Sequence, residues 1–139
     1  YNLDTTEIAM RAFALGDLLV YQQKYDEAII KYDSILIAFS GHTLTDEIYL
    51  RKSEIYCLQN KYDLALSELK RIEEDWSYDI LADDAIYKRA KIYENILDDM
   101  NNAMLLYEKI LLEHNSSVFV AESRKRFREL RGDNLKIEE

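Results

Sequence analysis

The sequence predicts an all-α protein made of about three stacked helical hairpins followed by a terminal helix. The chain has 139 residues with no proline and only three glycines, so it lacks the turn residues that strands joined by tight hairpins need. Hydrophobic residues make up 48% and charged residues 32%, which is typical of a globular protein. One short motif also occurs three times, and this repetition divides the chain into units.

The repeated motif reads "KYDEAIIKYDSIL" at 24–36, "KYDLALSELKRI" at 61–72 and, more loosely, "DDMNNAMLLYEKIL" at 98–111. Each copy has a central alanine, and the alanines are 37 and then 38 residues apart. A large apolar residue follows four positions later and an isoleucine seven positions later, an arrangement that marks one face of an α-helix. The aligned positions are Ala28, Tyr32 and Ile35, then Ala65, Leu69 and Ile72, then Ala103, Tyr107 and Ile110.

A second amphipathic stretch precedes each motif, at 8–22, 48–59 and 86–97, and a short polar turn joins the two. Each unit is therefore predicted to be a helical hairpin whose apolar face is too large to be covered within the unit. Such units must stack to hide that face from water. The expected units span about 8–40, 46–77 and 84–115.

The two ends of the array carry their own features. A last helix is expected over about 118–131, with Gly132 placed to end it. "DTTE" at Asp4–Glu7 is typical of a capping box at the start of the first helix. Phe119, Ser123, Phe127 and Leu130 share the inner face of the last helix, and Arg124, Lys125, Arg126 and Arg128 provide a polar outer face.

The first unit places Ala12-x2-Leu15-Gly16-x2-Leu19 before Ala28-x3-Tyr32, which resembles the tetratricopeptide repeat (TPR) pattern W-x2-L-G-x2-Y…A-x3-F. The resemblance implies a TPR-like α-α superhelix. The usual proline after the second helix is absent and the period is longer than 34 residues, so longer connections between units are expected. Corresponding residues are Tyr49, Ser53, Tyr56, Ala65 and Leu69 in unit two, and Ile86, Ala90, Tyr93, Ala103 and Tyr107 in unit three, with one residue inserted in its turn.

Two phrases, "ILADDAIYKRAKIYE" and "AESRKRFRELRGD", resemble the C-terminal part of TPR proteins from Bacteroidetes-type bacteria. They are also similar to repeats of envelope proteins of the outer-membrane-assembly and cell-division-coordinator kind. This likeness implies a bacterial protein and favours the cell envelope, in the periplasm or associated with the outer membrane, over the cytoplasm. The chain starts at Tyr1 rather than Met, so we expect 1–139 to be a single TPR-like domain from a longer chain.

The charge of the chain limits the classes of partner that it is expected to bind. The formal net charge is −9 and the isoelectric point is about 4.8, which argues against binding nucleic acid or anionic lipid. No apolar run approaches the roughly 18 residues of a transmembrane helix. The expected partner is a protein or peptide, with no membrane insertion by this segment and with self-association left open.

The sequence contains no recognisable catalytic or metal-binding pattern. Phosphate-binding glycine motifs are missing, and neither histidine belongs to a zinc or di-iron motif. His42 and His114 are expected to be solvated loop residues, and Cys57 a packed small hydrophobe. The acidic pairs Asp83-Asp84 and Asp98-Asp99 are of a kind that can bind calcium or perform acid–base chemistry, but helix capping and solvation explain them better. We therefore expect no enzyme activity and no cofactor.

The family resemblance implies that the first helix of each unit lines a concave groove. Its mixture of aromatic, aliphatic and charged side chains suits an extended peptide or a helix. The chaperone-tail clamp of some TPR proteins is rejected, because Phe13, Ala14 and Asp17 stand where that clamp needs basic residues and asparagine. The candidate partner-binding residues are Phe13, Asp17, Tyr21, Leu50, Arg51, Glu54, Tyr87, Lys88, Lys91 and Asn95.

A secondary site is the basic stripe of Arg124, Arg128 and Arg131, at helical spacings of four and three. It suits an acidic segment of another chain, or it is a solvated face paired with nearby glutamates. The leading functional hypothesis is a non-enzymatic scaffold that binds a peptide or protein segment in the groove. The alternative is a structural end-piece of a longer solenoid or a self-association module, whose apolar face at 8–22 is covered by preceding repeats.

Overall fold

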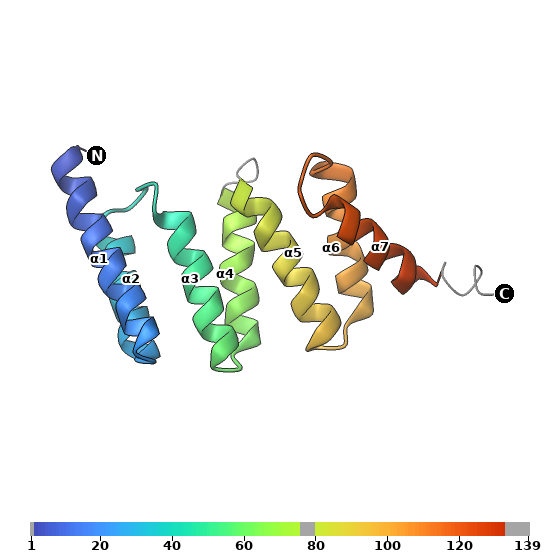
Figure 1. The fold of residues 1–139 in the computed structure, drawn as a ribbon, viewed down its shortest axis with the longest axis horizontal. Coiled ribbons are helices and arrows are strands. Elements are labelled where there is room, and N and C mark those ends of the chain that lie inside the picture. Colours follow the sequence, from blue (N-terminus) through green and yellow to red (C-terminus); the bar gives the residue numbers. More distant parts are fainter. Residues whose placement is uncertain (1, 76–79, 133–139) are drawn as a thin grey trace. The chain divides into compact units, whose positions relative to one another are not determined.

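A computed structural model describes residues 2–75 and 80–132 and shows an all-α protein (Figure 1). No strand occurs in these two ranges, so the predicted fold class is confirmed. Helices and short turns alternate along the chain. The helices are α1 (Leu3–Tyr21), α2 (Tyr25–Ala38), α3 (Thr45–Leu58), α4 (Tyr62–Asp75), α5 (Ile80–Asn95), α6 (Met100–Glu113) and α7 (Val120–Arg131).

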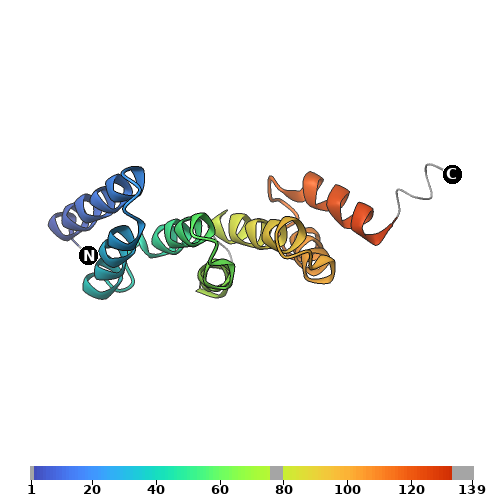
Figure 2. The same ribbon diagram turned by 90° about the horizontal axis from the view of Figure 1, so that it is seen from below.

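The chain forms two compact units, Tyr1–Glu68 and Leu69–Glu139. In the first unit α1 and α2 lie antiparallel as a hairpin, and α2 also contacts α3. In the second unit α5 and α6 form the same kind of hairpin, and α7 packs on α6 (Figure 2). Single-domain organisation over 1–139 stays a prediction.

The nine aligned repeat positions form the buried interior. All three alanines are 0% exposed, and no other aligned residue is more than 2% exposed. Ala28 belongs to a cluster that includes Ile48 and Ile55 of α3, and Ala103 to one that includes Ile86 and Ala90 of α5. The alanines are therefore small because another helix approaches there, as predicted.

The turns inside the hairpins repeat the same geometry without glycine. Gln23, Asn60 and Asp98 have φ angles of 62°, 60° and 53°, and each lies five residues before its aligned alanine. The next backbone N–H then bonds back to a carbonyl near the end of the first helix, as in a Schellman motif. The bonds are Lys24 to Leu19, Lys61 to Tyr56 and Asp99 to Tyr93, each 2.8 Å, and the last spans the predicted inserted residue.

Gly16 permits the closest helix approach in the first hairpin. A Cβ atom at this position would lie 2.5 Å from Cε1 of Tyr32. Because real Cβ contacts do not reach such distances, the ring of Tyr32 can pack against α1 only where the side chain is missing. The glycine of the TPR-like Leu15-Gly16 pair thus has a packing role here.

The expected capping box at Asp4–Glu7 is wrong. Helix α1 begins at Leu3, and the side chain of Asn2 accepts the backbone N–H of Thr5 at 2.8 Å. Asp4 therefore lies inside the first turn, where its charge interacts favourably with the helix dipole. At the other end the prediction is confirmed, because Gly132 ends α7 with a φ of 94°.

Both histidines are enclosed, which corrects the prediction that they are solvated. His42 is 5% exposed, its Nδ1 accepts the N–H of Leu44 at 3.1 Å, and its Nε2 lies 3.4 Å from Oγ1 of Thr6. Nδ1 of His114 lies 2.6 Å from Oδ1 of Asp83. These loops fold inward because the histidines close them against neighbouring helices.

Candidate protein-binding site

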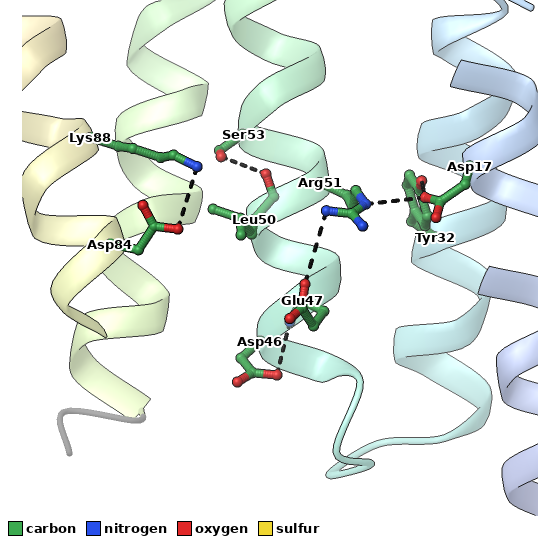
Figure 3. Close-up of polar contacts among 9 residues, drawn as sticks. All are labelled: Asp17, Tyr32, Asp46, Glu47, Leu50, Arg51, Ser53, Asp84 and Lys88. Atoms are coloured by element: carbon green, nitrogen blue, oxygen red, sulfur yellow. Dashed lines mark hydrogen bonds and ion pairs between the residues drawn. The ribbon is translucent and has the colours of Figure 1, made fainter. Parts of the chain in front are cut away.

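In the first unit, three candidate residues meet between α1 and α3. Nε of Arg51 donates to Oδ1 of Asp17 at 3.2 Å, and the guanidinium lies 5.5 Å from the ring centroid of Phe13. Figure 3 shows Arg51 pointing from α3 toward Asp17 and Tyr32. The hydroxyl of Tyr32 donates to the same carboxylate oxygen. The pair of Asp17 and Arg51 is thus built into the fold while about a third of each side chain remains exposed.

The environment shifts the protonation equilibria of this group. Burial, followed by the hydrogen bond to Asp17, raises the pKa of Tyr32. Burial alone would lower the pKa of Arg51, but Asp17 and Glu54 outweigh it and the pKa is raised. Both side chains therefore keep their protons, and the surface presents a fixed arginine beside an aromatic ring.

The remaining candidates of the first unit differ in accessibility. Tyr21 is 86% exposed at the end of α1, and Glu54 is exposed on α3. Leu50 is only 5% exposed, so its side chain offers little surface to a partner. The surface available in this unit is therefore Phe13, Asp17, Tyr21, Arg51 and Glu54.

In the second unit, an aromatic stack carries a lysine. The ring of Tyr87 on α5 stacks on Phe119 with centroids 4.4 Å apart and planes at 12°. Nζ of Lys91 lies 5.3 Å from the centroid of Tyr87 and 3.9 Å from Oε1 of Glu122 on α7. The groove prediction included Tyr87 and Lys91 but missed Phe119, which sequence reasoning placed only on the inner face of the last helix.

Two further candidates complete the α5 surface. Nζ of Lys88 lies 3.5 Å from Oδ2 of Asp84, one helical turn earlier (Figure 3). Asn95 is exposed at the end of α5. The α5 surface thus combines two half-exposed lysines with one aromatic ring, an arrangement that suits a partner with both apolar and acidic groups.

A buried ionic group lies beneath this surface. Oε1 of Glu94 accepts from the hydroxyl of Tyr107 at 2.7 Å and from Nε of Arg126 at 3.2 Å. Burial alone would raise the pKa of Glu94, but these two hydrogen bonds outweigh it and the pKa is lowered. Arg126 was predicted to face solvent; it instead points inward, because Glu94 needs a cation.

Two buried cations between helices were not predicted at all. Nζ of Lys52 lies 2.8 Å from Oδ1 of Asp33 on α2 and 3.4 Å from Oε1 of Glu68 on α4. Arg89, which stands 37 residues later at the same repeat position, pairs with Glu73. The sequence signal that could have predicted these two cations was their shared position in the repeat. These groups are largely enclosed, so they hold helices together rather than face a partner.

The basic stripe remains at the surface of α7. Arg124 and Arg128 are exposed, and the guanidinium of Arg131 lies 5.1 Å from the ring centroid of Phe127. Across residues 2–75 and 80–132, no cluster of three or more His, Cys, Asp or Glu side chains has the geometry of a metal site. In the same ranges, none of the helices has the length and apolar character needed to cross a membrane.

Residues 84–117 match the family model described as tetratricopeptide repeat. This stretch covers most of α5, all of α6 and the predicted third unit, so the match falls on the third helical hairpin. The match supports a TPR protein, a class whose repeats generally mediate protein–protein interaction. A search of curated proteins found no match.

Proposed function

We propose that this protein is a non-enzymatic scaffold that binds peptide or protein segments on the exposed surfaces of its first helices, α1 and α3 in one unit and α5 in the other. One observation carries the proposal: each unit presents a cation held against an aromatic ring. Arg51 lies over Phe13 in the first unit, and Lys91 lies over Tyr87 in the second. Such pairs offer a partner apolar area together with fixed charges.

The charges on these surfaces are already paired within the protein. Arg51 pairs with Asp17, Lys88 with Asp84, and Lys91 with Glu122. A partner therefore gains little from net charge and more from apolar contact, with the ion pairs setting orientation. This favours a segment that carries an aromatic or aliphatic anchor flanked by polar groups.

The test selects peptides from a display library on immobilised protein and measures their affinity by calorimetry. The double variant Phe13→Ala/Tyr87→Ala should weaken binding, and Tyr21→Ala/Lys88→Ala changes exposed candidate residues on α1 and α5 without removing core contacts. Ile37→Ala/Leu112→Ala, at exposed positions on α2 and α6, is the matched control. Unchanged affinity in both groove variants would refute the proposal.

A second candidate function is supported by the exposed face of α1. Ile8, Leu15 and Leu18 are each about half exposed, at 59%, 50% and 48%. Their counterparts 37 residues later are Thr45, Lys52 and Ile55, which are at most 8% exposed in the first unit. A preceding hairpin or a second copy of this chain would cover the α1 face in the same way. Sedimentation of the isolated chain tests this, since a strict monomer with no binding of hydrophobic dye would oppose it.

The envelope location is proposed on the resemblance of two short phrases alone. Fractionation of a bacterium that carries the native gene tests it. Recovery with periplasm or outer membrane is expected, and recovery with cytosol would refute it.

A further inference from the structure

A shallow hollow of about 320 Å³ lies between α6 and α7, on a surface that the proposed function does not use. Its centre is apolar, and Leu105 is 63% exposed there. Phe127 is half-buried and forms the α7 wall. The lining residues are Asn101, Met104, Leu105, Glu108 and Phe127.

The repeat shows which groups contact the corresponding face of a second helix elsewhere in the chain. Aligned on the alanines, Glu108 of α6 corresponds to Asp33 of α2. In the first unit Asp33 is 2.8 Å from Lys52, and α4 brings Glu68 to the same lysine. The group that meets Asp33 is thus a lysine of α3, and α4 adds a second carboxylate to that lysine. On α6, Glu108 has no ion pair or hydrogen bond among the described residues, so the corresponding position of α6 has no such partner.

A basic rim borders the hollow on the α7 side. Arg131 lies over the ring of Phe127, and Arg124 stands three residues before Phe127 on the same side of the helix. Arg128 continues the row, and among the described residues neither Arg124 nor Arg128 has an ion pair. In a chain of net charge −9, this is a local concentration of positive charge beside exposed apolar surface.

We propose that this hollow docks an acidic amphipathic helix of a partner protein. An apolar side chain of the partner packs on Leu105 and Phe127, while its carboxylates meet Arg124 and Arg128. Glu108 repels acidic groups at the opposite edge, so the acidic flank of the partner lies over α7. Nucleic acid is the less favoured ligand, because the rest of the chain repels phosphate.

The test uses a fluorescein-labelled synthetic peptide of residues 62–75, "YDLALSELKRIEED", capped at both ends. It is the chain's own example of an acidic amphipathic helix. A second peptide has the same sequence with every carboxylate replaced by its amide. Fluorescence anisotropy should show binding of the acidic peptide and at least about tenfold weaker binding of the amide form.

Matched variants locate the site. Arg124→Glu/Arg128→Glu should weaken binding by about tenfold or more, whereas Lys24→Glu/Lys61→Glu, with the same change of net charge at exposed positions, should leave it nearly unchanged. Leu105→Ser should weaken binding by about fivefold, and Leu112→Ser on the same helix is its control. Variants are first checked for native helicity.

Four results would overturn the proposal. The acidic peptide fails to bind, or both charge-reversal pairs weaken it equally. Single-stranded oligothymidylate binds more tightly than the peptide, which would assign the basic stripe of α7 to nucleic acid. Sedimentation shows dimers of the protein that Arg124→Glu/Arg128→Glu abolishes, which would assign the hollow to a second copy.

Discussion

At the residue scale, each of the two buried tyrosines of the second helices donates its hydroxyl to a carboxylate of the preceding helix. An arginine of the following helix donates to the same carboxylate. Sequence reasoning placed both tyrosines in the core, and their burial confirms it. It did not predict the hydroxyl partners, because the carboxylate stands at a different repeat position in each unit. The groups are Tyr32, Asp17 and Arg51 in the first unit, and Tyr107, Glu94 and Arg126 in the second.

Glu94→Gln should lower the free energy of unfolding by about 2 kcal/mol at about pH 7, because it removes the charged acceptor that Arg126 and Tyr107 share. The pKa of Glu94 is lowered from its ordinary value of 4.5, so its stabilisation is fully present above that value. It is lost as pH falls through the lowered pKa. Urea unfolding of wild type and Glu94→Gln at about pH 7 and at about pH 3 measures this loss of stability.

The difference between wild type and Glu94→Gln should therefore shrink at about pH 3. Glu74→Gln, at an exposed side chain on α4, serves as the control and should change stability little at either pH. An equal loss at both pH values would mean that the charge of Glu94 is not the stabilising feature.

Ser123→Ala should raise the free energy of unfolding by about 1 kcal/mol. Ser123 is 0% exposed inside α7, and its hydroxyl has no hydrogen-bond partner among the described residues. Ser53 is the matched control, because it is equally buried but donates to the carbonyl of Leu50 at 2.6 Å. Thermal unfolding compares the two, and a destabilised Ser123→Ala would contradict this account.

At the element scale, the sequence predicted the helices well and their ends less well. The aligned alanines fixed where the second helices lie, since offsets of zero, four and seven must face inward. Helix starts were missed where capping competes among neighbouring residues, as at Asn2 and Asp4. The loops with His42 and His114 were misjudged because enclosure of a loop side chain depends on tertiary contacts.

Gln23→Gly should raise the free energy of unfolding by about 1 kcal/mol, because glutamine is held at a φ of 62° that glycine adopts without strain. Gln22→Gly is the control, since Gln22 has a φ of −80° and gains nothing from glycine. Chemical denaturation measures both variants. Equal effects would show that the left-handed turn stores no strain.

At the scale of the whole molecule, composition and repetition were enough to predict an all-α repeat protein, and residues 84–117 match the tetratricopeptide family. The exposure of the candidate residues was predicted in part, because the family resemblance implied which positions of a first helix face outward. Register alone did not predict that Leu50 is buried or that Phe119 stacks on Tyr87. Both depend on neighbouring helices, whose side chains the repeat pattern does not specify.

The account depends on hairpins that pack against other helices at their aligned alanines. Methyl NMR of alanine-labelled protein tests this directly. We expect the Ala28 methyl to show NOEs to the other helices of its cluster, such as Ile48 or Ile55 on α3, and the Ala103 methyl to Ile86 or Ala90 on α5. Alanine methyls without such contacts, or extended-chain Cα shifts at these residues, would contradict the account.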